Sequence, residues 1–283
     1  MRAVLLDVFT DRPLTGNQLA VFLDGSEVPE ASRQDIAREI GFSETVFVDE
    51  PSHPTAGDAR IRIHTPEVEL PFAGHPVLGT AVAVAAHRVV AGGSVVTLEC
   101  GIGPVPVELD GSGSGGWMRQ PLPTWRDWDD PASLLDALGV AAGRLAAPVE
   151  VYDNGPTHLV VAVDDPVVVA TATPDTGRLA RLAGRTGSSL CAMTGNGTAV
   201  TRMFVPGLGI TEDPATGSAA GPVGVHLLRH GLLPPGHELT LSQGAQINRP
   251  STLLVRVEGG PDAVAAVGVG GSAVIVGELS FSF

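Results

Sequence analysis

Alternating apolar and polar residues predict one of the strands of the chain. Between residues 59 and 64, Ile61 and Ile63 alternate with Arg60 and Arg62, which is the period of two that a half-buried strand shows. Other apolar runs, bounded by turn-forming residues, predict further strands. These lie at residues 2–9, 14–22, 45–48, 95–98, 105–109, 157–163 and 200–205.

Two longer segments lack any charged residue and predict helices of another kind. Residues 76–86 and 214–228 would be apolar on every side, and such a helix is buried all round. Shorter helices are predicted elsewhere from apolar spacing and end signals. They span residues 32–40, ended by Gly41, and residues 131–138, which begin after Asp130 and end at Gly139.

The uncharged segments belong to an internal repeat. A shift of 143 residues superimposes the residues before the first segment on those before the second: Glu69, Pro71 and Gly74 fall on Glu212, Pro214 and Gly217. Gly79 falls on Pro222, which we expect to interrupt or delay the second helix. We predict an α+β protein of two pseudo-symmetric halves, residues 1–120 and 121–283. Each is a curled sheet or barrel around a buried helix, and the last strand is free to return to the first half.

Composition excludes several classes of function. The 283 residues carry 17 basic and 31 acidic side chains, a net charge of -14, which disfavours binding to nucleic acid or to an anionic membrane surface. All 17 basic residues are arginine. Without lysine there is no Schiff-base lysine, no pyridoxal-phosphate chemistry and no P-loop lysine.

The cysteines and histidines predict neither a disulfide framework nor a metal site. Cys100 and Cys191 stand alone without CxxC spacing. We find no metal-ligand spacing among His53, His64, His87, His226, His230 and His237. No apolar run suits a signal peptide or reaches the roughly 20 residues of a membrane span. These features favour a cytoplasmic protein.

The two matched turns are candidate anion sites. Gly74 and Gly217 each stand where a buried helix begins, and free backbone amides at a helix start attract negative charge. Together they could hold one small carboxylate without a lysine. The alternative is that each glycine only permits a tight turn.

Motifs along nearly the whole chain resemble the phenazine-biosynthesis PhzF family. They are residues 15–22 (TGNQLAVF), 41–47 (GFSETVF), 70–76 (LPFAGHP) and 212–219 (EDPATGSA). Weaker matches lie at Gly155, His158, 202–206, 243–244 and 249–251. Gln18 departs from the family, which usually has proline there, and Asn248 stands where glycine is common.

The resemblance implies a fold similar to diaminopimelate epimerase, with the active site between the halves, and a homodimer. The best-known activity of the family is isomerisation of trans-2,3-dihydro-3-hydroxyanthranilate without a cofactor. Carried over, Glu44 would be the catalytic base, and His75 and Asp213 its partners. Gly74, Gly217 and Ser218 would hold the carboxylate of the substrate.

Each of these residues also has a structural interpretation. Glu44 could be a solvated residue at the start of a strand, and His75 could bond a nearby carbonyl. Asp213 before Pro214 is a common helix cap, and Ser218 could be an ordinary first-turn hydroxyl.

Two other functions stay open on the same fold. One is a protein that binds a small acid without turnover. The other is a two-thiol racemase, although Ala73 and Thr216 stand at or beside the positions where its cysteines would be.

Overall fold

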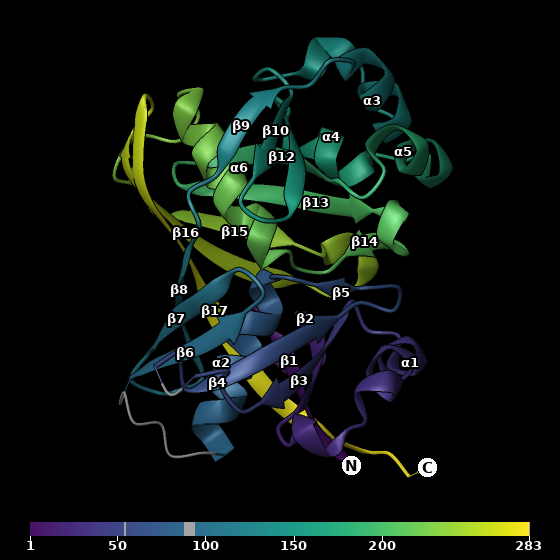
Figure 1. Ribbon diagram of the computed structural model, residues 1–283. Helices are drawn as coiled ribbons and strands as arrows, with labels where there is room; N and C mark the ends of the chain where they lie inside the picture. Colours follow the sequence, from purple (N-terminus) through teal and green to yellow (C-terminus); the bar gives the residue numbers. More distant parts are fainter. Residues whose placement is uncertain (54, 88–93, 283) are drawn as a thin grey trace. The chain divides into compact units, whose positions relative to one another are not determined.

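Figure 1 shows the computed structural model, which describes residues 1–53, 55–87 and 94–282. The chain divides into two compact units. The first comprises Met1–Arg119 and Gly270–Phe283, and the second comprises Gln120–Val269. Helices and strands occur in both, so the predicted α+β class is confirmed. Within the described residues, no helix is long and apolar enough to cross a membrane.

The strands of the first unit pair in a closed ring. Their order is β17 (Ala263–Ser280, which belongs to this unit from Gly270 on), β1 (Arg2–Val8), β2 (Asn17–Phe22), β3 (Glu44–Asp49), β4 (Ala59–His64), β6 (Val95–Cys100), β7 (Gly103–Leu109) and β8 (Gly115–Gln120). β8 in turn pairs with β17. The last strand thus lies beside the first, with Ser280 opposite Arg2 and Ala273 opposite Val8.

Helix α2 (Gly74–His87) fills this ring. It contacts β1, β2, β3, β6 and β7, and its residues are buried from Gly74 to Val84. The predicted burial on all sides is therefore confirmed. Gly79 permits the close approach, because a Cβ there would lie 2.6 Å from the Leu19 side chain and 2.7 Å from that of Val8.

The remaining elements of the first unit are short. α1 (Glu30–Ile40) starts two residues before the predicted position and stops at Gly41. The φ of Gly41 is 70°, a left-handed conformation that glycine adopts without a Cβ penalty. β5 (Glu69–Leu70) pairs with β4 directly before the turn into α2.

The second unit is built on one continuous sheet. Its strands lie in the order β9 (Thr124–Asp127), β10 (Glu150–Asp153), β11 (Thr157–Ala162), β12 (Gly187–Gly195), β13 (Thr198–Val205), β15 (Leu239–Gln243) and β16 (Ser251–Gly260). β14 (Ile210–Asp213) adds to β13. α6 (Gly217–Arg229) contacts β11, β12 and β16 and is buried from Gly217 to Leu228.

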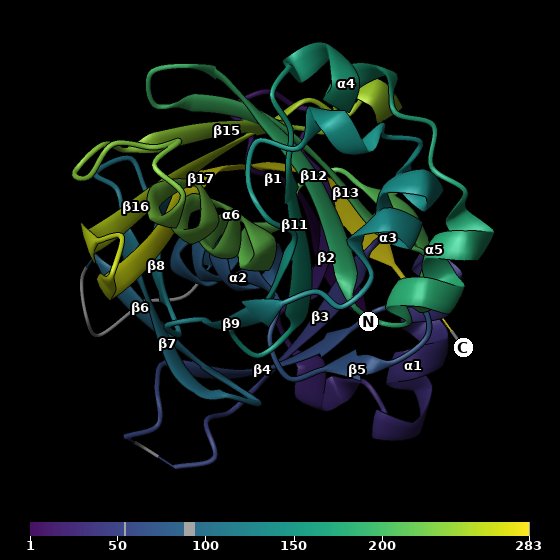
Figure 2. The same ribbon diagram turned by 90° about the horizontal axis from the view of Figure 1, so that it is seen from above.

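Three shorter helices pack elsewhere on this sheet, as Figure 2 shows: α3 (Pro131–Leu138), α4 (Pro166–Thr171) and α5 (Thr176–Ala183). They share an apolar core with β11 and β12 that includes Leu134, Leu159, Leu179 and Leu190. The predicted ends of α3 are confirmed: Asp130 accepts a hydrogen bond from the Ser133 amide, and Gly139 ends the helix. Short 3₁₀ turns occur at Gly25–Glu27, Ala142–Arg144, Pro206–Leu208 and Ala245–Ile247.

The two units repeat one topology. In the first, β2 and β3 are parallel, β3 and β4 antiparallel, and β4 and β6 parallel. In the second, the same sequence recurs in β11 with β12, β12 with β13, and β13 with β15. The buried helix follows the same short strand each time, β5 before α2 and β14 before α6. The predicted duplication is confirmed.

The prediction for Pro222 was wrong, because α6 runs through it without a break. Proline has no N–H to donate to the carbonyl four residues earlier, here that of Ser218. The Asn154 side chain donates to this carbonyl at 2.9 Å, and the Gln120 side chain donates to the Gly217 carbonyl at 2.7 Å. The Asn154 amide therefore replaces the missing helical bond, and α6 begins at Gly217 in spite of Pro222.

Candidate functional site

Glu44 and His75 meet in the first unit. Glu44 is the first residue of β3, which starts soon after Gly41 ends α1. The residue opposite Glu44 is Leu19 of β2, the parallel neighbour of β3. His75 is the second residue of α2. Both side chains are buried, and Glu44 Oε2 lies 3.4 Å from His75 Nδ1. The strand and the helix therefore bring together the predicted base and one predicted partner.

His75 is neutral at physiological pH. Burial lowers its pKa to about 3, although a hydrogen bond with the Gln18 backbone acts in the opposite direction. The Asn17 side-chain amide lies 3.2 Å from Nδ1. His75 Nε2 is buried and has no hydrogen-bond partner among the described residues. The pair is thus a neutral imidazole beside a carboxyl group, with one ring nitrogen available to a ligand.

Asp213 and Ser218 belong to the second unit. Asp213 ends β14, and Gly217 and Ser218 begin α6. The helix follows Thr216, so Asp213 is not its cap residue. Instead, the Asp213 carboxylate accepts a hydrogen bond from the Thr216 hydroxyl. The capping alternative for Asp213 does not hold.

The predicted site residues therefore form two groups. Glu44, Gly74 and His75 lie together in the first unit, at the starts of β3 and α2. Asp213, Gly217 and Ser218 lie together in the second, at the end of β14 and the start of α6. Action of both groups on one substrate stays a prediction.

Two polar partners of Asp213 were not predicted from the sequence. They are Thr216 and Gln243, the last residue of β15, whose side chain hydrogen-bonds both Thr216 and the Asp213 backbone. The sequence did contain a signal for Gln243. The shift of 143 residues that aligns the two turns also superimposes Cys100-Gly101 on Gln243-Gly244.

A second polar cluster lies near the far end of α6. The prediction that no histidines have ligand spacing overlooked His226 in α6 and His230, the cap residue at the end of this helix, four residues later. Their ligand atoms and that of Glu150 lie within 4.8 Å of one another. Arg229 Nη1 and the Tyr152 hydroxyl, however, each donate to Glu150 Oε2 at about 2.6 Å. Since Arg229 already supplies the positive charge, the cluster fits a hydrogen-bond network that ties α6 to β10.

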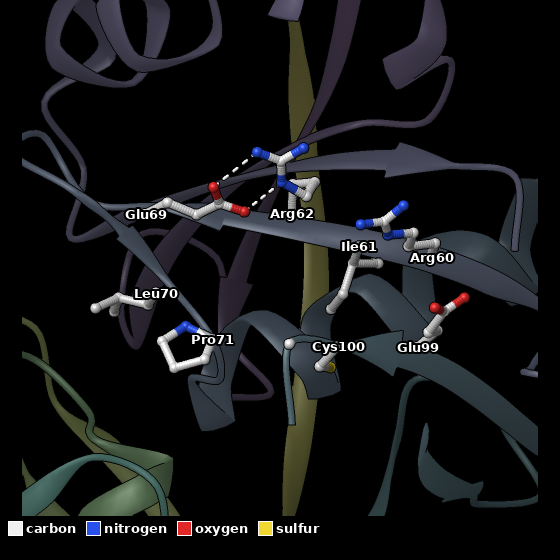
Figure 3. A pocket seen from close by; sticks show the side chains of 9 residues that line it. Arg60, Ile61, Arg62, Glu69, Leu70, Pro71, Glu99 and Cys100 are labelled. Carbon is white, nitrogen blue, oxygen red and sulfur yellow. Dashed lines mark hydrogen bonds and ion pairs between the residues drawn. The ribbon is translucent and has the colours of Figure 1, made fainter. Parts of the chain in front are cut away.

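A hollow of about 680 Å³ opens on the first unit, but it is not the predicted site. Figure 3 shows it between the forked Arg62–Glu69 ion pair, Pro71 and Cys100. Neither Glu44 nor His75 is among its lining residues.

The thiols do not suit a two-cysteine racemase. Cys100 and Cys191 are buried and unpaired with each other, and burial raises the pKa of each to about 12. The positions next to the helix starts hold Ala73 and Thr216. Neither thiol is an ionised nucleophile at neutral pH.

Comparisons with known proteins found similar sequences and similar structures. A family profile described as "Phenazine biosynthesis-like protein" matches residues 6–278. The trans-2,3-dihydro-3-hydroxyanthranilate isomerase of Pseudomonas aeruginosa is 41% identical over 281 residues, which cover 98% of each chain.

Two solved structures are similar over almost their whole length. A predicted epimerase from Pseudomonas aeruginosa has a TM-score of 0.80 at 33% identity, covering 99% of this chain and 98% of the other. A PhzF-family protein from Bacillus anthracis has a TM-score of 0.87 at 24% identity, covering 100% and 99%. The predicted family resemblance, epimerase-like fold and isomerase class are confirmed.

Proposed function

Because the chain belongs to the phenazine biosynthesis-like (PhzC-PhzF) family, we propose that it moves a proton between two carbons of a small carboxylate-bearing substrate, without a cofactor. The observation that carries this proposal is the buried contact of Glu44 with a neutral His75. A carboxylate held against a C–H bond can remove its proton, provided that the electron-rich intermediate is stabilised. The substrate named for the 41% identical relative, trans-2,3-dihydro-3-hydroxyanthranilate, is the first to test.

The roles follow from the groups and their surroundings. Glu44 takes the proton from the first carbon. His75 has a buried ring nitrogen without a partner among the described residues, so it can orient a polar group of the substrate and take part in the proton's return to the second carbon. Asp213 shares these two tasks from the second unit. The isomerisation has no net change in protons or electrons, so the proposal needs no oxidant, reductant or second reactant.

We propose that backbone amides at the starts of α2 and α6 hold the substrate carboxylate. Gly74, Gly217 and Ser218 lie in these first turns, where N–H groups lack helical acceptors. The chain has no lysine that could take this role. A ligand-bound crystal structure with the carboxylate on an arginine instead would contradict this assignment.

The experiment is turnover in deuterated water, followed by NMR. The wild-type protein should incorporate deuterium at carbon in the product. Glu44→Gln should slow turnover by about a hundredfold to ten-thousandfold, the usual contribution of a general base, while substrate binding persists. The matched control is Glu50→Gln, which removes an exposed carboxylate just beyond the other end of β3 and should leave turnover unchanged.

The outcomes separate the alternatives. Binding of the substrate without deuterium exchange by the wild type would favour the non-catalytic acid-binding protein. Near-wild-type turnover by Glu44→Gln would move the role of base to His75 or Asp213. Loss of binding together with turnover would mean that Glu44 mainly shapes the site.

We also propose that the protein acts as a homodimer in the cytoplasm. The dimer rests on the family resemblance, and monomeric elution in size-exclusion chromatography with light scattering would contradict it. The compartment rests on two unpaired, buried thiols, which suit a reducing environment.

A further inference from the structure

We infer that Gln243 is a positioning residue, which directs the hydroxyl proton of Thr216 at the Asp213 carboxylate. The inference rests on the proposed function, in which Asp213 acts on the substrate. In this scheme Gln243 does not touch the substrate, but it determines the orientation of the Asp213 carboxylate.

Backbone groups fix the orientation of the Gln243 amide. Its Nε2 donates to the Asp213 backbone carbonyl at 2.8 Å, and its Oε1 accepts from the Thr216 backbone N–H at 3.2 Å. A backbone carbonyl can only accept and a backbone N–H can only donate, so the reversed amide would lose both bonds. Gln243 is buried, with 4% of its surface exposed, which makes these bonds costly to lose.

This orientation determines the direction of the next hydrogen bond. Gln243 Nε2 also donates to the Thr216 hydroxyl oxygen, at 3.0 Å. The Thr216 hydroxyl has a single proton, which Gln243 Nε2 cannot accept, so it is donated to Asp213 Oδ2. The chain from glutamine to threonine to aspartate therefore runs one way and holds the carboxylate as a hydrogen-bond acceptor in one orientation.

The duplicated unit shows that the turn itself does not need a glutamine. The equivalent of Gln243 is Cys100, and the glycine after each packs on the proline of its turn. A Cβ on Gly101 would lie 2.7 Å from Pro71 Cα, and one on Gly244 would lie 2.5 Å from the Pro214 carbonyl. The glycine thus packs against the proline of its turn with a cysteine in this place as well, and the Cys100 Sγ lies 3.8 Å from the Leu98 carbonyl of its own strand. Gln243 makes its polar contacts with the turn of the second unit, and Cys100 has no side-chain amide that could make them in the first unit.

The test is a double-mutant cycle measured as kcat and KM on trans-2,3-dihydro-3-hydroxyanthranilate. Gln243→Met keeps the side-chain length without the donors, and Thr216→Val keeps the shape without the hydroxyl. Each should lower kcat by about tenfold to hundredfold, the range for one hydrogen bond to a charged group, with KM changed by less than about threefold. The double variant should be no slower than either single variant, because both break one chain. Thr216→Ser should restore turnover, and Cys100→Ala is the matched control.

Other results would overturn the inference. Additive losses, or full activity of Gln243→Met where Asp213→Asn is inactive, would show that Gln243 does not act through Asp213. If Asp213→Asn keeps full activity, the proposed role of Asp213 fails instead, and if the wild type does not turn the substrate over, the proposed substrate fails. In that case a crystal structure of Gln243→Met decides separately: an Asp213 carboxylate unmoved on Thr216 refutes the positioning role, and a rotated one supports it. Thermal melting shows whether each variant is folded.

Discussion

The turns before α2 and α6 are built on the same ion pair in different surroundings. In each unit, two side-chain nitrogens of an arginine bind the carboxylate of a glutamate in the short strand before the helix. Arg62 of β4 binds Glu69 of β5, and Arg202 of β13 binds Glu212 of β14. The first pair is partly solvated, with 22% and 39% of the side chains exposed, and borders the hollow in Figure 3. The second is buried, at 9% and 8% exposed. Arg202 also donates to the carbonyls of Val169 and Ala172.

The two turns share a common framework, but the groups around that framework differ. The framework of the turn is retained, with its ion pair, its proline and the glycine that opens the helix. The groups around it have diverged. The offset of 143 residues superimposes His75 on Ser218 and Cys100 on Gln243. One unit therefore has a buried imidazole beside a glutamate, and the other has a carboxylate held by hydroxyl and amide groups.

The largest effect expected from this comparison concerns the free energy of unfolding. Arg202→Met should reduce it by about 3–5 kcal/mol, because Glu212 is left as a buried charge without its partner. Arg62→Met should cost at most about 1 kcal/mol, since solvent screens the exposed pair and hydrates the remaining glutamate. Urea unfolding of both variants at pH 7 measures the difference.

The double variant Arg202→Met with Glu212→Leu is the control for this pair. It should recover most of the loss, because no unpaired charge remains. Equal losses for Arg62→Met and Arg202→Met would show that burial does not distinguish the two ion pairs.

A smaller effect per pH unit is expected when the protein is acidified, and it comes from His75 at the start of α2. The pKa of His75 is lowered to about 3 by burial, against about 6.5 in an unfolded chain. The unfolded state therefore binds the proton first, and stability falls as the pH decreases from about 6.5 to about 3. His75→Gln should remove this contribution, whose slope is at most about 1.4 kcal/mol per pH unit.

Unfolding free energies at several pH values between 7 and 4 measure that slope. His158 is also fully buried and has its pKa lowered to about 4, so part of the pH dependence should persist in His75→Gln. His237→Gln, at an exposed position, is the matched control. An unchanged slope in His75→Gln would mean that the imidazole is solvated or charge-paired in solution.

The sequence predicted what local pattern and internal repetition determine. The uncharged segments identified α2 and α6, and the motifs identified Glu44 beside the start of a strand. The partners that depend on folding were not predictable. Asn154 replaces the bond that Pro222 cannot make, although 68 residues separate them in the chain. Gln243 ends β15, which pairs with β13 in the folded sheet, and no short motif encodes its contact with Thr216.

The smallest effect on turnover is expected from removing the thiols. This change tests whether Cys100, at the position equivalent to Gln243, takes part in the reaction. Cys100 occupies the place of Gln243, yet its pKa is raised to about 12 by burial, as is that of Cys191. Thiols that stay protonated are poor nucleophiles and poor bases. The double variant Cys100→Ala with Cys191→Ala should therefore turn over substrate within about twofold of wild type, and iodoacetamide should not inactivate the folded wild-type enzyme. Loss of proton transfer in that variant, with its melting temperature unchanged, would show that a thiol takes part in the mechanism, and the same loss in the Cys100→Ala single variant would make the first unit's cysteine the functional counterpart of Gln243.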